Sequence, residues 1–351
     1  MLPQSMKIME DFQVRKSKKQ KEAFRAWLCG ELEAAGCAPK VEESFAAKNV
    51  VAGDPDTAKV IFSAHYDTCA VLPIPNFITP RNLFFYICYQ MLFLLIFFLV
   101  VFTAELAVFF LTDASLEVGM AVSYALCAFM VWWIITGPAN KHTANDNSSG
   151  VVTLLETALA MPREDREKVC FVFFDNEEKG MFGSAAFTKR HKKAKKETLN
   201  INFDCVSDGD FIQFFPGKRL KRDGAALEQI GEAFAGRGEK RTEVVRGFGF
   251  YPSDNASFKR GVGVCALKHN KIVGYYMNRI HTARDTVFEE ENIELLRDGA
   301  LRLAKKFRSG LDTENLFVYS YDSRAAGYSN ANRRRHPCRI KFISRARERT
   351  T

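Results

Sequence analysis

The sequence lacks the cysteine patterns that mark a zinc ribbon or a disulfide framework. Its nine cysteines, an odd number, include no CxxC pair and follow no recurrent spacing, which argues against both classes. We therefore expect free thiols and a reducing compartment. The first thirty residues carry charges throughout and contain no long apolar stretch, so we expect no cleavable signal peptide there.

Most of the chain also has little excess charge. The net charge is +9, but eight basic residues and one acidic residue lie between Arg333 and Thr351. This short segment therefore holds about seven of the excess positive charges. The remainder is close to neutral, and we expect no nucleic-acid partner. Residues 310–351 show no core-forming pattern and are predicted to be a basic, disordered C-terminal tail.

Charge is missing altogether from the longest apolar run. Leu83–Thr103 has no charged residue, and Gly119–Gly137 is similarly apolar. Each is long enough for a helix that crosses a bilayer, so residues 83–137 are predicted to contact lipid as a transmembrane hairpin. Arg81 and Lys141 flank the pair, whereas the connection carries only acids, which predicts two spans with both termini and the main domain in the cytoplasm. The alternative is a buried helical pair in a soluble domain.

The rest of the sequence is typical of an α/β fold. The apolar run Val169–Phe174 predicts a strand buried on both faces, inside a parallel sheet that helices cover. Further strands are predicted at Asn49–Ala52, Lys59–Ala64, Leu199–Phe203, Phe211–Phe215 and Gly261–Leu267. Helices are predicted at Lys18–Leu32, Val151–Ala160, Ala225–Ala235 and Glu290–Phe307, and the basic segment Phe187–Lys196 as a solvated helix face.

Metal-ligand residue types follow several of these strands or lie in nearby loops. They are His65, Asp146, Glu178, Asp204 and His281. Because ligands bind at the carboxyl ends of parallel strands, this set suits two divalent ions that share one bridging carboxylate. Glu177 can act as general base if the backbone turns sharply, which Gly180 and Gly183 favour. We interpret Asp175 as a support for that turn.

The same stretches resemble the M28 zinc aminopeptidases. In the family's order they are SAHYDT (63–68), ANDNSSG (144–150), FFDNEEKGMFGS (173–184), INFD (201–204), SDNASF (253–258) and HTARDT (281–286). The resemblance implies a three-layer α/β/α sandwich with a mixed, largely parallel central sheet. The two-helix hairpin would be an insertion into that fold.

The resemblance also implies a role for each ligand. His65 and Asp204 would hold one Zn²⁺, Glu178 and His281 would hold the other, and Asp146 would bridge both. Other divalent metals are compatible with these ligand types.

Three further residues complete the predicted site. By the same resemblance, Glu177 would be the catalytic base that takes a proton from the attacking water, and Asp67 would orient His65. Tyr251 is a candidate substrate contact that stabilises the oxyanion.

These observations predict a membrane-anchored dinuclear zinc aminopeptidase that acts on peptides. Residues 1–81 and 139–309 would form its catalytic domain, around a hairpin at 82–138 and before a tail at 310–351. Two alternatives remain open. A related amidohydrolase or glutaminyl cyclase would use the same fold, in some cases with a single metal. A non-catalytic receptor or scaffold would have lost ligands, and all five are present here. No oligomeric state is predicted.

Overall fold

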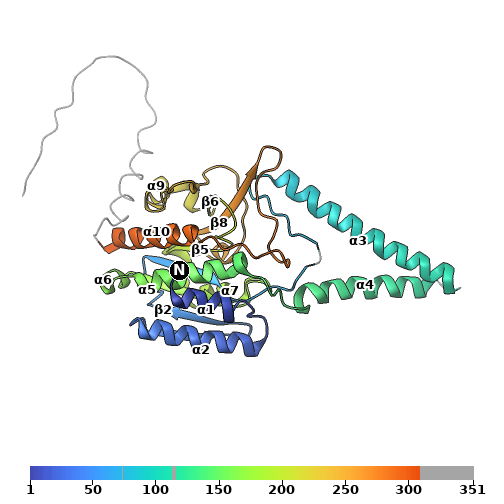
Figure 1. The fold of residues 1–351 in the computed structure, drawn as a ribbon, viewed down its shortest axis with the longest axis horizontal. Helices are drawn as coiled ribbons and strands as arrows, with labels where there is room; N and C mark the ends of the chain where they lie inside the picture. The colour runs from blue at the N-terminus through green and yellow to red at the C-terminus, as the bar shows by residue number, and fades with distance from the viewer. Residues whose placement is uncertain (73, 113–115, 309–351) are drawn as a thin grey trace, which may run out of the picture. The chain divides into compact units, whose positions relative to one another are not determined.

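The computed structural model describes residues 1–72, 74–112 and 116–308 (Figure 1). The predicted tail at 310–351 lies outside the described residues. The described residues form one mixed sheet with the strand order β1-β2-β4-β3-β5-β8-β6-β7, and β9 pairs with β8. The strands are β1 (Pro39–Glu43), β2 (Lys48–Ala52), β3 (Val60–His65), β4 (Val169–Phe174), β5 (Leu199–Phe203), β6 (Phe211–Pro216), β7 (Arg241–Val244), β8 (Gly261–Asn270) and β9 (Gly274–Tyr276).

The centre of the sheet is parallel. β3 pairs in parallel with β4 on one side and β5 on the other, and β5 pairs in parallel with β8. Antiparallel pairs lie outside this core, between β2 and β4 and between β6 and β8. The carboxyl ends of β3, β4 and β5 therefore meet at one edge of the sheet, where α/β proteins bind ligands.

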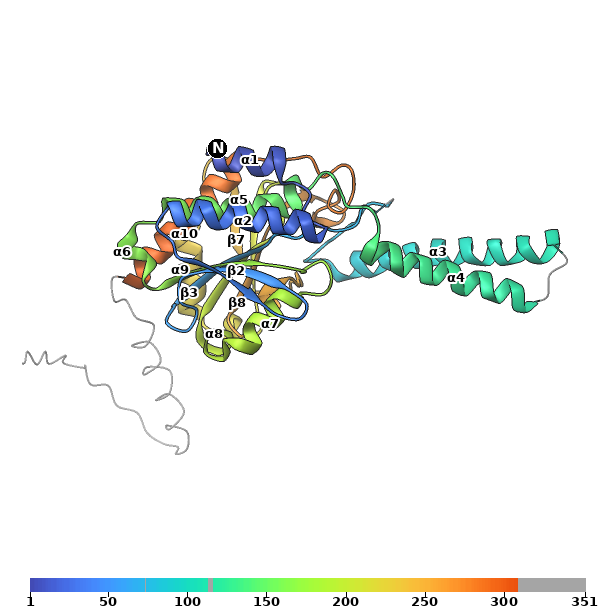
Figure 2. The same cartoon turned by 90° about the horizontal axis from the view of Figure 1, so that it is seen from below.

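Helices cover both faces of the sheet, as the sandwich prediction requires. They are α1 (Pro3–Asp11), α2 (Lys18–Ala34), α5 (Gly150–Ala160), α6 (Arg163–Arg166), α7 (Phe182–Arg190), α8 (Lys192–Glu197), α9 (Gly224–Ala233) and α10 (Glu290–Arg308). In β4, Phe171 and Phe173 pack in the same core as α2, α5, α9 and α10. Val172 and Phe174 face the other way and pack with Phe187 of α7 and Ala194 of α8. These two helices lie across the sheet from α2 and α5 (Figure 2). This alternation explains the continuous apolar run.

The local sequence explains where α2 begins, but it did not predict several other helices and strands. The Ser17 hydroxyl accepts a hydrogen bond from the backbone N–H of Gln20, and the Gln20 side chain accepts one from the N–H of Ser17. This reciprocal cap starts α2 at Lys18, as predicted. In contrast, α1, β1, β7 and β9 were not predicted, and the basic segment 187–196 is divided at His191 between α7 and α8.

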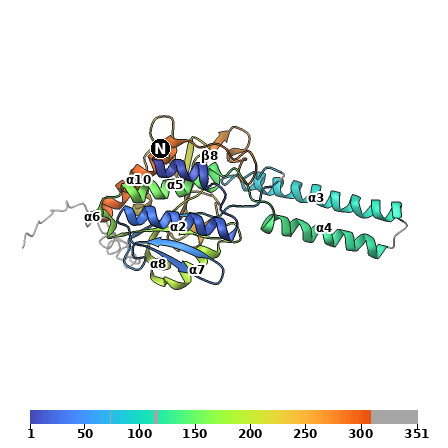
Figure 3. The ribbon, with the colours of Figure 1, turned by 60° about the horizontal axis from the view of Figure 1, so that its bottom comes forward.

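Two long apolar helices, α3 (Leu83–Thr112) and α4 (Leu116–Thr136), pack against each other (Figure 3). Both are long and apolar enough to cross a membrane, and the protein buries only 6% of the most apolar window of each. α3 continues beyond the predicted end at Thr103. It includes Glu105, whose carboxylate accepts a hydrogen bond from the Ser123 hydroxyl of α4 at 2.8 Å.

Candidate metal centre

His65, at the end of β3, faces three carboxylates. Its Nε2 lies 3.4 Å from Asp146 Oδ1 and 3.6 Å from Asp204 Oδ1, while its Nδ1 lies 3.5 Å from Asp67 Oδ1. Asp67 also accepts hydrogen bonds from the backbone N–H groups of Glu177 and Glu178, at 2.9 and 3.2 Å. Asp67 therefore ties the end of β3 to the turn after β4, in addition to facing the His65 ring.

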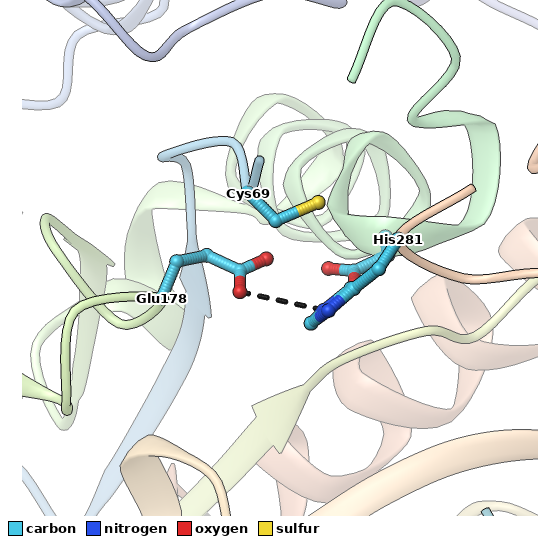
Figure 4. A group of neighbouring side chains, drawn as sticks. Cys69, Glu178 and His281 are labelled. Carbon is cyan, nitrogen blue, oxygen red and sulfur yellow. Dashed lines mark ion pairs between the residues drawn. The ribbon is translucent and has the colours of Figure 1, made fainter. Parts of the chain in front are cut away.

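Asp146 lies between the two histidines. It belongs to the irregular helical turn η1 (Ala144–Ser149), which leads into α5. Its Oδ2 lies 2.9 Å from Nε2 of His281, which is itself 3.3 Å from Glu178 Oε2 (Figure 4). The Asp146 carboxylate thus lies close to the imidazoles of both His65 and His281. This is the position that a ligand bridging two metal ions occupies.

The predicted ligands fall into overlapping groups that could hold metal ions. One contains His65, Asp146 and Asp204, and a second contains Asp146, Glu178 and His281 together with Cys69. The structure therefore brings all five predicted ligands together in two groups that share Asp146. A third group joins His65 with Glu177 and Glu178. Cys69 was not predicted to belong to the site.

The electrostatics fit a cation at this position. Burial raises the pKa of Glu178 to about 8, and the Asp146 carboxylate adds to that rise although His281 opposes it. Burial lowers the pKa of His281, but the carboxylates of Glu178 and Asp146 outweigh it and raise that pKa to about 10. The buried Oε1 of Glu178 has no hydrogen-bond partner among the described residues. Crowded carboxylates with an unpartnered oxygen are stabilised by a divalent cation.

The turn after β4 is held by a buried ion pair. Lys21 Nζ of α2 lies 2.6 Å from Asp175 Oδ1 and donates to Asn176 Oδ1 at 2.8 Å. Asp175 Oδ2 also accepts a hydrogen bond from the backbone N–H of Lys48. Asn176 has a φ of 56°, in the left-handed region that asparagine tolerates. This turn directs Glu177 to the site, and Asp175 supports it from behind.

Two residues that position the site were missed. Asp285 accepts hydrogen bonds from the backbone N–H groups of Asn145 and Asp146, at 2.8 and 2.9 Å. Asp285 lies in the motif HTARDT, and this motif is the sequence feature that could have identified it. Arg15 is completely buried, and its guanidinium donates to the Tyr66 carbonyl and the Ser148 hydroxyl. The sequence could not identify Arg15, because it lies in a charged segment that is typical of a solvent-exposed surface.

A cavity of about 220 Å³ opens beside these groups. Glu177 and Asp204 line its polar part, while Leu83 and Tyr86 from the first turn of α3 contribute to its apolar wall. Tyr251 also lines it, but the Tyr251 hydroxyl donates to the backbone carbonyl of Asp204 at 3.2 Å. The cavity is suited to a small apolar side chain beside a reactive polar group.

Comparisons with known proteins agree with this geometry. The model of peptidase family M28 matches residues 130–302. The chain has the fold of peptidase family M28. The matched part contains four of the five predicted ligands and Glu177, whereas His65 and Asp67 precede it. A search of curated proteins gives no match.

Solved structures with the M28 fold include two kinds of enzyme. The LapA aminopeptidase of Legionella pneumophila is 15% identical, with a TM-score of 0.54, over 88% of this chain and 71% of that one. The glutaminyl cyclase of Porphyromonas gingivalis is 15% identical, with a TM-score of 0.50, over 85% of this chain and 92% of that one. At this identity the likeness shows the shared fold alone.

Proposed function

We propose that the protein is a dinuclear zinc aminopeptidase that hydrolyses N-terminal peptide bonds. The observation that carries this proposal is the pair of ligand groups that share Asp146 at the edge of the sheet. His65 and Asp204 would hold one Zn²⁺, and Glu178 and His281 the other. When bound, these ions polarise the scissile carbonyl and activate the attacking water.

Side chains of the protein would transfer the proton, position the base and contact the substrate. Glu177 lines the cavity and would accept the proton of the attacking water, then pass it to the leaving amine. Burial raises the pKa of the Glu177 carboxyl well above its ordinary value, and a bound cation opposes that shift. Asp67 keeps Glu177 in place through its backbone N–H. Leu83 and Tyr86 would contact the side chain of the residue that is removed.

The expected activity is release of free amino acids from aminoacyl reporter peptides. A chelator should abolish it, zinc should restore it, and the same peptides with acetylated N-termini should not react. Metal analysis should find two zinc ions per chain. A glutaminyl cyclase is the second candidate, because enzymes of that kind share the fold. Cyclisation of N-terminal glutamine without hydrolysis, at one metal per chain, would replace the proposed function with that one.

We also propose that α3 and α4 anchor the protein in a membrane. Their exposed side chains include Phe84, Leu95 and Phe110, which are 72%, 66% and 73% exposed, and so large an apolar surface is unfavourable in water. His65 precedes the pair and Asp146 follows it, yet their side chains lie 3.4 Å apart. In a membrane, both ends of the pair would therefore lie on one side, which requires an even number of spans.

Topology reporters should place the C-terminal segment and the connection between α3 and α4 on opposite sides of the membrane. A reporter fused after Ser344 should read out in the cytoplasm, and one inserted after Thr112 should read out on the far side. The protein should remain in membranes washed at high pH. Cytoplasmic readout at both positions, with release by the wash, would contradict membrane anchoring. An extracytoplasmic readout after Ser344 alone would reverse the orientation.

A further inference from the structure

Cys69 lies beside the half of the centre that contains Glu178 and His281. The ligand atoms of Cys69, Asp146, Glu178 and His281 all lie within 4.8 Å of one another. Figure 4 shows the Cys69 sulfur, the Glu178 carboxylate and the His281 ring turned toward a common space. The thiol thus adds a fourth donor to the three already described.

The backbone holds Cys69 in this position from both sides. Its carbonyl accepts a hydrogen bond from the N–H of Asn140, and the next residues continue the contact, since Val71 N–H donates to the Pro138 carbonyl. Leu72 N–H donates to the carbonyl of His281 at 2.7 Å. Cys69 is only 4% exposed. Its sulfur is therefore placed by backbone contacts with the chain that returns from α4 and with a ligand.

An independent observation points to a cation at this position. The Glu178 side chain is 10% exposed, and its buried Oε1 has no hydrogen-bond partner among the described residues. The carboxylate faces the same space as the thiol (Figure 4). A buried carboxylate oxygen without a partner is costly unless a cation or a donor completes its contacts.

The donor set matches the coordination chemistry of zinc. Zn²⁺ takes four nitrogen, oxygen or sulfur ligands in a tetrahedral arrangement. A thiolate among them favours zinc and cobalt over magnesium and manganese. We propose that Cys69 is the fourth protein ligand of the ion held by Asp146, Glu178 and His281. The proposal rests on the dinuclear site proposed above. On metal binding the thiol would release its proton to solvent and bind as thiolate.

This assignment makes the two halves of the centre unequal. An ion with four protein ligands has no open position, whereas the ion at His65, Asp146 and Asp204 would have three protein ligands and one open position. His65 and Glu177 line the 220 Å³ cavity, and Cys69 lines a second cavity of about 80 Å³, whereas Glu178 and His281 line both. The ion on the Cys69 side would therefore still border the larger cavity, and the open position would lie on the His65 side.

Cobalt substitution tests the sulfur ligand without relying on activity. The full-length protein in detergent should bind two Co²⁺ and show a thiolate-to-cobalt charge-transfer band in the near ultraviolet, beside the visible ligand-field bands. Cys69→Ser should keep the ligand-field bands and lose the charge-transfer band. Its affinity for the second zinc should fall by at least about 10-fold. Cys69→Ala provides a second variant for the same measurement.

Cys205→Ser is the matched control, because the Cys205 thiol is also buried and donates to Asp204 Oδ1 at 3.1 Å. This variant should keep the charge-transfer band. Two bound cobalt ions without that band would overturn the role of Cys69 and leave the dinuclear site intact. A band that survives in Cys69→Ser and vanishes in Cys205→Ser would do the same. A protein that binds no cobalt would contradict both proposals.

Discussion

Replacing Glu177 with glutamine should lower kcat by about 100-fold to 10,000-fold while the protein keeps both zinc ions. The amide has nearly the same shape as the carboxylate but cannot accept the proton of the attacking water. The backbone N–H of residue 177 still donates to Asp67, so the turn after β4 should be unchanged. Hydrolysis of a reporter peptide and metal analysis of the same preparation measure the two effects.

The adjacent glutamate supplies the comparison. Glu178 lies 3.3 Å from His281 Nε2, so Glu178→Gln should lose the second zinc ion as well as activity. Glu177 also shares a group with His65 and Glu178 that could hold a metal. If Glu177→Gln binds one zinc ion fewer than the wild type, Glu177 is a ligand and its assignment as the base is wrong. An unchanged kcat would equally exclude that assignment.

Replacing Asp146 with asparagine should have the largest effect on metal binding. Its two oxygens lie 3.4 Å from His65 Nε2 and 2.9 Å from His281 Nε2. A neutral amide at the shared position weakens both groups at once, so we expect at most one zinc ion per chain and a loss of roughly 1,000-fold or more in kcat/KM, because metal ions supply several kcal/mol of transition-state stabilisation.

Thermal unfolding separates this effect from simple misfolding. A metal that binds only the folded state stabilises it by about 4 kcal/mol at 1,000 times its Kd. Zinc should therefore raise the Tm of the wild type and leave that of Asp146→Asn nearly unchanged. With a chelator present the variant should still unfold cooperatively but at a lower Tm than the wild type, because the amide loses the ion pairs that the Asp146 carboxylate makes with His65 and His281. An equal rise in Tm with zinc for both proteins would exclude the bridging role.

The sequence was sufficient to predict an element where the residue types and their spacing along the chain indicate the same structure. The run Val169–Phe174 predicts β4 because a strand buried on both faces needs apolar residues at every position. The metal-ligand types could be expected at one edge because parallel strands bring their carboxyl ends together. Arg15 could not be assigned, since it acts through hydrogen bonds to residues far away in the sequence, and for Asp285 the motif HTARDT gave no indication of its partners. Nothing in local periodicity encodes such partners.

The sequence also did not predict the end of α3, a helix that makes contacts with a later part of the chain. The first apolar helix was expected to stop at Thr103, before the charge of Glu105. It continues to Thr112, and the Glu105 carboxylate within it accepts a hydrogen bond from the Ser123 hydroxyl of α4, a later helix. Cys69 was missed for a related reason. A single thiol after a histidine carries no pattern, and its role depends on Glu178 and His281 arriving from later parts of the chain.

The position of the hairpin gives the protein an order of assembly during synthesis. β3 is made before α3, but both of its neighbours in the sheet, β4 and β5, are made after α4. A nascent chain that has reached Thr112 therefore holds β3 and His65 without either neighbouring strand. The ribosome must produce α4 before the sheet can close around β3 and before Asp146 can reach His65. A chain that ends within its hairpin would thus leave the ribosome without β4, β5 and Asp146, and so without an assembled metal centre.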